Sequence, residues 1–205
     1  YIGSFHSVCL RLMKEHLGGA PDENIKRMMD AFEQTYLVCR NIDEFRFLKN
    51  YSKWITADEP WQQAVDICTY VNQIMEELVD IEALQKDSDE DMRFLGKLVA
   101  RYTALLERNG VMDFSAIQTE TYHMLETHPE ILADIRHKLD YIMVDEYQDT
   151  NTAQFQLIKL LAGKYKNLCV VGDDDQSIYK FRGANIYNIL NFEKEFPNAK
   201  IVKLE

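Results

Sequence analysis

Two clusters of acidic residues are the part of this sequence best suited to chemistry. Asp145 and Glu146 follow the apolar run 141–144, and Gly172-Asp173-Asp174-Asp175 follows the apolar run 168–171. A carboxylate at the end of a strand can hold Mg²⁺, usually through water. The next residue can orient or deprotonate an attacking water. These residue types indicate phosphate chemistry, although an Asp-Glu pair by itself is equally compatible with solvated surface acids.

A parallel sheet is needed to bring the two clusters together. The runs 141–144 and 168–171 have the length and apolar character of buried parallel strands. Helices are expected at 152–161 and 186–196, and a third strand at 201–204. Alternation of strands and helices predicts a parallel sheet with right-handed crossovers. Ligands bind beyond the carboxyl ends of such strands, so both clusters are expected on one edge.

The chain before this sheet, from about residue 8 to 138, predicts helices. Helical periodicity is clear at 61–84 and at 92–108, and Asn109-Gly110 is a helix end signal. Asp87-Ser88-Asp89 predicts a loop between them. A further helix is expected to begin at Pro21 and to present one apolar face, made by Ile25, Met28, Met29 and Phe32.

Longer strings around both acidic clusters resemble a known family. They read Val144-Asp145-Glu146-Tyr147-Gln148-Asp149-Thr150-Asn151 and Val171-Gly172-Asp173-Asp174-Asp175-Gln176-Ser177-Ile178-Tyr179-Lys180-Phe181-Arg182-Gly183-Ala184. In order and spacing they resemble motifs II and III of superfamily 1 helicases of the UvrD/Rep/PcrA type. Ser4-Phe5-His6-Ser7 looks like the family's Thr-Phe-His-Ser segment, and Met112-Asp113-Phe114 looks like its Leu-Asp-Phe segment.

The resemblance implies an α/β fold, in which a partial P-loop NTPase (RecA-like) parallel sheet carries a large all-helical inserted subdomain. Residues 1–15 and 111–205 would belong to the ATP-binding subdomain 1A, and residues 16–110 to the helical subdomain 1B. The implied activity is ATP-dependent movement on single-stranded DNA with unwinding of duplex DNA. Expected partners are single-stranded DNA, duplex junctions and a second motor subdomain of the same parent chain.

Roles for individual residues follow from the same resemblance. The implied nucleotide is ATP with Mg²⁺. Asp145 and Asp173 would bind the metal, and Glu146 would be the catalytic base. Gln176 would sense the γ-phosphate, and Gln148 and Asp149 would couple the nucleotide to motion. Single-stranded DNA would be contacted by Phe5, His6, Tyr179, Phe181 and Arg182. Aromatic rings can stack on any base, which agrees with this assignment. For aromatics outside such a string, packing in the core is the commoner role.

The phosphate-binding pattern GxxxxGK[ST] does not occur among these 205 residues. That loop cradles the nucleotide phosphates through its backbone N–H groups and its lysine. In the resembled family it precedes the Phe-His segment, and the chain begins with Tyr1 rather than Met. We therefore expect a fragment that is inactive by itself.

Composition and net charge limit the class of protein but do not indicate a mechanism. The net charge of −11 has the wrong sign for a protein that simply coats nucleic acid. The acids crowded between Asp58 and Asp91 are best explained as a solvated helical face. The four cysteines form no CxxC pattern and lie among apolar neighbours, which predicts free buried thiols and a cytoplasmic location. No apolar run is long enough for a membrane helix, so no membrane partner is expected.

Two alternatives stay open at this stage. A non-catalytic DNA-binding or interaction module could retain the sheet and lose hydrolysis, although such a module has no use for both Glu146 and Gln176. The chain could also be the helicase part of a helicase–nuclease.

Overall fold

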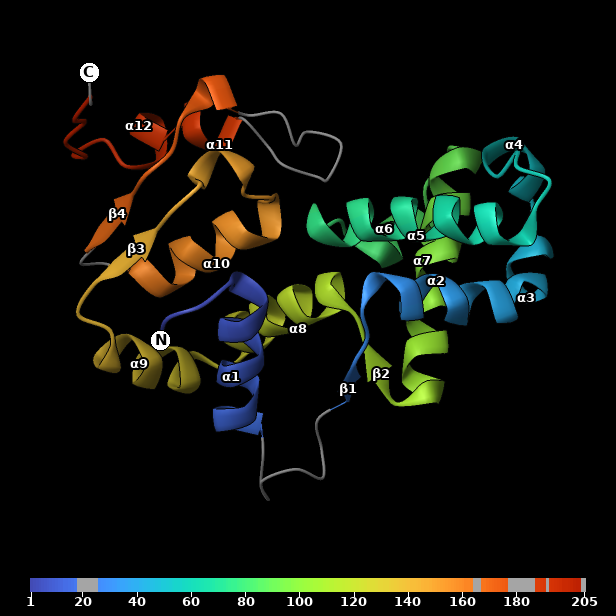
Figure 1. Ribbon diagram of the computed structural model, residues 1–205, viewed down its shortest axis with the longest axis horizontal. Coiled ribbons are helices and arrows are strands. Elements are labelled where there is room, and N and C mark those ends of the chain that lie inside the picture. Colours follow the sequence, from blue (N-terminus) through green and yellow to red (C-terminus); the bar gives the residue numbers. More distant parts are fainter. Residues whose placement is uncertain (18–25, 164–166, 177–186, 191, 204–205) are drawn as a thin grey trace. The chain divides into compact units, whose positions relative to one another are not determined.

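A computed structural model describes residues 1–17, 26–163, 167–176, 187–190 and 192–203. The chain divides into two compact units, Tyr1–Thr127 and His128–Glu205, called unit 1 and unit 2 below. The fold is mixed α/β, mostly helical with short parallel strands (Figure 1). This confirms the predicted α/β class in its coarse form. Among the described residues no helix is long and apolar enough to cross a membrane.

Unit 1 is a helical assembly with one short parallel ladder. Its elements in chain order are α1 (Phe5–Leu17), β1 (Arg27–Met28), α2 (Ala31–Arg40), α3 (Ile42–Arg46), α4 (Tyr51–Trp54), α5 (Pro60–Glu76), α6 (Ile81–Gln85), α7 (Glu90–Asn109), β2 (Val111–Met112) and α8 (Phe114–Thr127). Helix α5 packs against α2, α7 and α8, α6 packs against α7, and α1 packs against α8.

Strands β1 and β2 lie side by side, although more than eighty positions separate them in the sequence. They are parallel, with Arg27 opposite Val111 and Met28 opposite Met112. The backbone N–H of Met29 also donates to the carbonyl of Met112 at 2.8 Å. The chain therefore enters the helices α2–α7 and leaves them at neighbouring points.

This ladder corrects the helix predicted from Pro21. Met28 belongs to a strand, and helix α2 begins only after Asp30, whose side chain accepts from the N–H of Glu33 in a capping box. Met29 is buried and Phe32 is largely exposed, so they do not share an apolar face. Pro21 and Ile25 lie outside the described residues.

The helix predicted over 61–84 is interrupted. Helix α5 ends at Glu76, and Leu78 adopts a left-handed backbone with φ of 53° before α6 begins. The predicted helix over 92–108 is confirmed by α7, which ends at Gly110 in the left-handed conformation that favours glycine.

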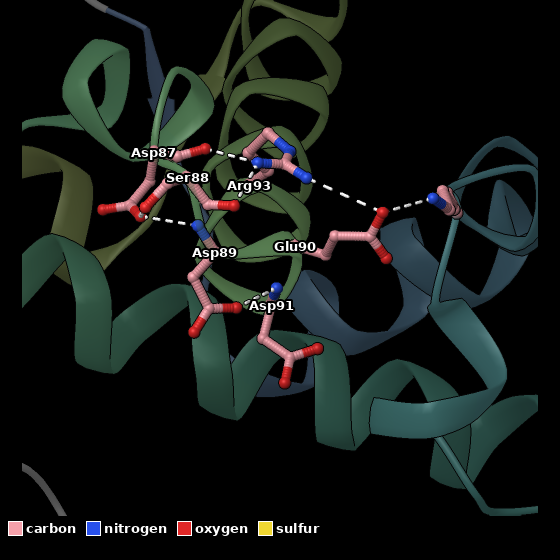
Figure 2. A network of polar contacts seen from close by, with 7 residues as sticks. Asp87, Ser88, Asp89, Glu90, Asp91 and Arg93 are labelled. Atoms are coloured by element: carbon pink, nitrogen blue, oxygen red, sulfur yellow. Dashed lines mark hydrogen bonds and ion pairs between the residues drawn. The ribbon is translucent and has the colours of Figure 1, made fainter.

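Acidic residues hold the start of α7 (Figure 2). The Asp89 carboxylate accepts from the N–H of Asp91 at 2.7 Å, and the Asp87 carboxylate accepts from the N–H of Asp89 at 2.8 Å. Arg93 donates to the carbonyls of Asp87 and Ser88. Carboxylates are stabilised at a helix N-terminus by the macrodipole. The acidic run therefore has a structural explanation in this part of the chain.

The core of unit 1 contains a buried polar network. The Gln34 amide donates to the Asp113 carboxylate at 2.9 Å, to the Tyr102 hydroxyl at 2.8 Å and to the Asn72 side chain at 2.8 Å. Tyr102 also donates to Asp113, and the second Asp113 oxygen accepts from the N–H of Ala116 at 2.7 Å. Burial, followed by the charge of Asp113, raises the pKa of Tyr102. One carboxylate thus ties α2 and α7 to the start of α8.

Unit 2 contains the predicted parallel strands. Its elements are α9 (Pro129–Lys138), β3 (Ile142–Val144), the 3₁₀ turn η1 (Tyr147–Asp149), α10 (Thr152–Ala162), β4 (Leu168–Val170), the 3₁₀ turn η2 (Asp174–Gln176), α11 (Tyr187–Leu190) and α12 (Phe192–Glu195). Strands β3 and β4 pair in parallel, with Met143 opposite Cys169. Helix α10 connects them and packs against α9 (Figure 1).

Two expectations for this region are wrong. Residues 201–203 form no strand, so the predicted third strand is absent from the described part of the chain. The helix predicted at 186–196 agrees with the described residues, which are helical in α11 and α12 on either side of residue 191. Cys169 is exposed, whereas Cys9 and Cys68 are buried as predicted and Cys39 is half-buried.

Candidate active site

The parallel pairing of β3 and β4 brings the two acidic clusters to one edge of the sheet, as predicted. Beyond the strands, the N–H of Val171 donates to the carbonyl of Val144 at 2.8 Å, and the N–H of Tyr147 donates to the carbonyl of Val171 at 2.9 Å. These bonds continue the pairing into both loops. Asp145 and Glu146 therefore lie beside Gly172 and Asp173.

Glu146 has an unusual backbone. Its φ of 50° and ψ of 42° place it in the left-handed region, where a residue with a Cβ costs about 1–2 kcal/mol. The turn is closed by the N–H of Asp149, which donates to the Glu146 carbonyl at 2.9 Å, and the Asp145 carboxylate accepts from the N–H of Glu146 at 2.9 Å. Both carboxylates are exposed. Strain of this kind occurs most often at active sites and ligand clamps.

Gln148 links the two loops. Its side chain is only 1% exposed. The amide nitrogen donates to the Glu146 carboxylate at 2.7 Å, and the amide oxygen accepts from the N–H of Asp173 at 3.1 Å. A Cβ on Gly172 would lie 2.7 Å from that amide oxygen, so the glycine leaves the room that Gln148 occupies.

Asp173 organises the second loop. Its carboxylate accepts from the N–H of Asp175 at 3.0 Å and from the side-chain amide of Gln176 at 2.7 Å, while its carbonyl accepts from the N–H of Gln176 at 3.1 Å. Together with Gln148, these contacts form a continuous hydrogen-bonded chain from Gln176 to Glu146. Four of the predicted site residues are thus brought into one connected group.

The acidic edge suits a magnesium ion that arrives with a phosphate ligand. Among the described residues no three His, Cys, Asp or Glu side chains are grouped as a closed metal site. Mg²⁺ needs none, because it keeps several waters and is usually bound by one or two carboxylates together with substrate phosphates. Asp145, exposed at the end of β3, has the donor chemistry for this binding.

Asp149, in the turn η1 next to this edge, has a carboxylate oxygen without a hydrogen-bond partner among the described residues. This atom, Oδ1, is enclosed. Burial, followed by the nearby charge of Glu146, raises the pKa of Asp149 above the ordinary value of an aspartate. An acidic side chain with a raised pKa therefore lies close to Glu146.

Comparison with known proteins identifies the family. Residues 1–197 match the family described as the UvrD/REP helicase N-terminal domain. The chain belongs to this family. It is 36% identical over its whole length to the ATP-dependent DNA helicase PcrA of Staphylococcus aureus and 37% identical to that of Staphylococcus epidermidis. The chain spans 27% of the length of these relatives.

A second set of predicted residues for this UvrD/REP family member lies in unit 1. Phe5 and His6 are half-buried at the start of α1. The His6 ring lies 4.7 Å from the ring of Phe114, and His6 Nε2 is 2.9 Å from the amide nitrogen of Gln118. Burial lowers the pKa of His6, against the opposing charge of Asp113. The neutral imidazole is thus favoured.

Phe114 was not among the site residues expected from the sequence, although it contacts His6. Its ring is 44% exposed, although it is a large apolar side chain at the start of a helix. The signal was present, because Phe114 is the last residue of the Met112-Asp113-Phe114 segment that resembles a family motif. Contact with His6 joins that segment to the Phe-His segment.

The remaining predicted DNA contacts, Tyr179, Phe181 and Arg182, lie outside the described residues. A hollow of about 500 Å³ is present in unit 2, but it opens at the other edge of the sheet and is lined by Arg136, His137, Tyr141 and Asn167 among others. None of the predicted site residues that the structure describes lines this hollow.

Proposed function

We propose that this chain is part of the motor core of an ATP-dependent DNA helicase that couples ATP hydrolysis to movement on single-stranded DNA. The observation that carries the proposal is the hydrogen-bonded chain Gln176–Asp173–Gln148–Glu146 at the carboxyl ends of β3 and β4. A binding module needs no connection between a general base and a second polar loop. A motor needs one, because hydrolysis has to respond to events elsewhere in the protein.

Each polar residue of the edge has a proposed role. Glu146 accepts the proton of the water that attacks the γ-phosphate of ATP. Asp145 binds the Mg²⁺ that accompanies ATP, with Asp173 in support, and this ion neutralises phosphate charge when bound. Gln176 contacts the terminal phosphate, and Gln148 passes a change in its position to the base. These roles agree with the exposure of Asp145 and Glu146 and the burial of Gln148.

Single-stranded DNA is the proposed track. In unit 1 the exposed ring of Phe114, next to His6, offers a face on which a base can stack, for about 1–3 kcal/mol per base. Phe5, together with Tyr179, Phe181 and Arg182 of the second motif, completes the proposed contacts. The names of the two PcrA relatives, which are DNA helicases, support this choice of ligand.

The proposed ATP site requires more protein than these 205 residues. Parallel sheets are normally covered on both faces, yet Met143 in β3 is 78% exposed. The sequence also contains no GxxxxGK[ST] loop. We propose that a RecA-like P-loop sheet, with residues 16–110 as a helical insertion, is completed in the intact protein, and that a second motor subdomain closes the nucleotide site. The neighbouring strands β1 and β2 support the insertion.

The decisive experiment compares the intact protein with the 205-residue chain. ATP hydrolysis and strand separation are measured with and without single-stranded DNA. We expect DNA-stimulated hydrolysis and unwinding by the intact protein, and hydrolysis no faster than buffer by the chain alone. An intact protein that binds DNA without hydrolysing ATP would establish a non-catalytic module instead.

The DNA contacts are tested by a salt titration of oligonucleotide binding to the intact protein. Phe181→Ala is expected to weaken binding by about 1–3 kcal/mol with little change in salt dependence, because it removes one stacked base. Arg182→Ala is expected to flatten the plot of log affinity against log salt by about 0.7, the value of one phosphate contact. Normal binding by Phe181→Ala at every salt concentration would assign that ring to packing.

A further inference from the structure

Asn188, in the short helix α11, is a buried polar residue with no role in the function described so far. Its side chain is 8% exposed. The amide nitrogen donates to the Thr150 carbonyl at 3.0 Å, the Thr150 hydroxyl at 3.2 Å and the Asn151 carbonyl at 3.3 Å. The two N–H groups of this amide are therefore shared among three oxygen atoms at the end of the loop that begins with Asp145 and Glu146.

Thr150 connects Asn188 to the backbone next to Glu146. Its hydroxyl donates to the Tyr147 carbonyl at 2.8 Å, and its N–H donates to the same carbonyl at 3.2 Å. Tyr147 directly follows Glu146 and is fully buried. At the other end, Asn151 caps α10 through a capping box with Gln154. The turn is thus fixed on both sides by side-chain hydrogen bonds.

The same stretch of chain also contacts the second acidic loop. A Cβ on Gly172 would lie 3.0 Å from Cδ1 of Ile189, which follows Asn188. In α12, the Phe192 ring packs edge-on against Tyr147, with centroids 5.5 Å apart. Helix α11 therefore braces both loops of the acidic edge, and Asn188 supplies the polar part of that brace.

A left-handed glutamate needs such support. A strained backbone persists only where the surrounding structure over-determines it. We propose that Asn188 is a positioning residue that holds Glu146 in the orientation required for hydrolysis, acting through Thr150 and Tyr147. The inference rests on the proposed function, because Glu146 needs precise placement only if it is the general base.

The test uses Asn188→Ala in the intact protein. We expect kcat for ATP hydrolysis with saturating single-stranded DNA, per nucleotide-binding site, to fall about tenfold or more, since small displacements of a catalytic group have effects of this size. The KM for ATP should change by less than about twofold, because Asn188 touches no residue proposed to bind nucleotide. Counting nucleotide-binding sites removes any effect of a smaller folded fraction.

Asn167→Ala is the matched control. Asn167 is also an asparagine of unit 2 whose amide donates to a backbone carbonyl, that of Asp140 at 2.9 Å, but it precedes β4 at the far edge of the sheet. We expect this variant to hydrolyse ATP like the wild type. If Asn188→Ala does not fold, Asn188→Ser keeps one donor at the same position, and an intermediate kcat is expected.

A double-mutant comparison separates positioning from general stabilisation. If Asn188 acts through Glu146, then Asn188→Ala should lower the residual rate of Glu146→Gln by less than about twofold. A further tenfold loss in that background, or a wild-type kcat for Asn188→Ala or Asn188→Ser alone, would overturn the inference. A wild-type intact protein without DNA-stimulated hydrolysis would instead refute the proposed function.

Discussion

Asp113 in unit 1 and Asp145 in unit 2 both follow directly after a short parallel strand, yet their surroundings are opposite. Asp113 is 2% exposed, and its carboxylate accepts hydrogen bonds from Tyr102, Gln34 and the N–H of Ala116. Asp145 is exposed and accepts from the N–H of Glu146. The same sequence pattern therefore produces a structural carboxylate in one unit and a carboxylate available to a ligand in the other.

The difference lies in how the oxygen atoms are used. A carboxylate whose lone pairs are already occupied by buried donors stabilises the fold and has little left for a substrate. An exposed carboxylate beside a strained backbone contributes little to stability and remains open to a metal, a water or a phosphate. Substitutions in the two units should accordingly affect different measurements.

The largest effect is expected at the exposed edge. In the intact protein, Glu146→Gln should lower ATP hydrolysis by about 10²–10⁴-fold, the usual contribution of a positioned general base, and leave nucleotide binding intact. Steady-state hydrolysis and nucleotide titration measure the two quantities. Glu193→Gln, an exposed residue of α12, is the control. Wild-type turnover by Glu146→Gln would show that another group is the base.

The buried carboxylate should act on stability instead. Asp113→Ala leaves the Tyr102 hydroxyl without its acceptor, removes one of the acceptors of the Gln34 amide and leaves the N–H of Ala116 without its side-chain partner. We expect the free energy of unfolding to fall by about 3–5 kcal/mol, since each unsatisfied buried group costs about 1–3 kcal/mol. Urea unfolding of the chain measures it.

Asp134→Ala is the control for Asp113→Ala, because the Asp134 carboxylate is half exposed and forms a surface ion pair with Lys138. Such pairs contribute about 0–1 kcal/mol. Equal losses for the two variants would contradict the structural role assigned to the buried network.

Gly172→Ala tests the close contact between the two loops at a smaller scale. The added Cβ would lie 2.7 Å from the Gln148 amide oxygen and 3.0 Å from Ile189, so Gln148 must shift. We expect hydrolysis by the intact protein to fall about tenfold, as for a slight misplacement of the base. Overpacking should also lower stability by about 1–3 kcal/mol.

Gly110→Ala provides the matched control for Gly172→Ala. Its φ of 60° makes alanine unfavourable by about 1–2 kcal/mol, but a Cβ there would meet nothing within 4 Å. This variant should lose stability without losing hydrolysis. Normal hydrolysis by Gly172→Ala would show that Gln148 does not link the loops.

Much of the candidate site could be predicted because it depends on local pattern. Apolar runs ended by acids correctly indicated β3, β4 and the edge where Asp145 and Asp173 meet. Helix α7 was predicted because Gly110 marks its end. Gln148 was named from the resemblance, with a coupling role as the expectation. Its hydrogen bonds to Glu146 and Asp173 depend on side-chain placement, which sequence spacing does not determine.

Other features depend on contacts distant in sequence. Met28 and Met29 fit a helical face by spacing, but pairing with β2 places Met28 in a strand. Leu78 interrupts the predicted helix with a left-handed backbone, and no glycine or proline at this position indicates the interruption in the sequence. Asn188 gave no sequence signal, since its role arises only where α11 meets Thr150 and Asn151.

Asp149 combines features of the buried and the exposed carboxylates. Its substitution should change the free energy of unfolding least, and should raise it, whereas substitution of Asp113 lowers it. Its Oδ1 is enclosed without a partner among the described residues, and burial followed by the Glu146 charge raises its pKa. A raised folded-state pKa means that the ionised form destabilises the native state at neutral pH. This cost disappears as the pH falls through the folded-state pKa, toward the unfolded value of about 4.

Asp149→Asn removes the charge and keeps the shape, so it should raise the urea midpoint of the chain slightly at pH 7. The gain should shrink as the pH is lowered and vanish below about pH 3, where the wild-type residue is protonated in both states because its unfolded-state pKa is about 4. In the intact protein the same substitution should lower DNA-stimulated hydrolysis, because the proposed coupling role explains why a destabilising carboxylate stands beside the base. A midpoint that is lower than wild type at pH 7 would show that Asp149, like Asp113, is a structural carboxylate, and the distinction between the two units would then not extend beyond Asp145 and Glu146.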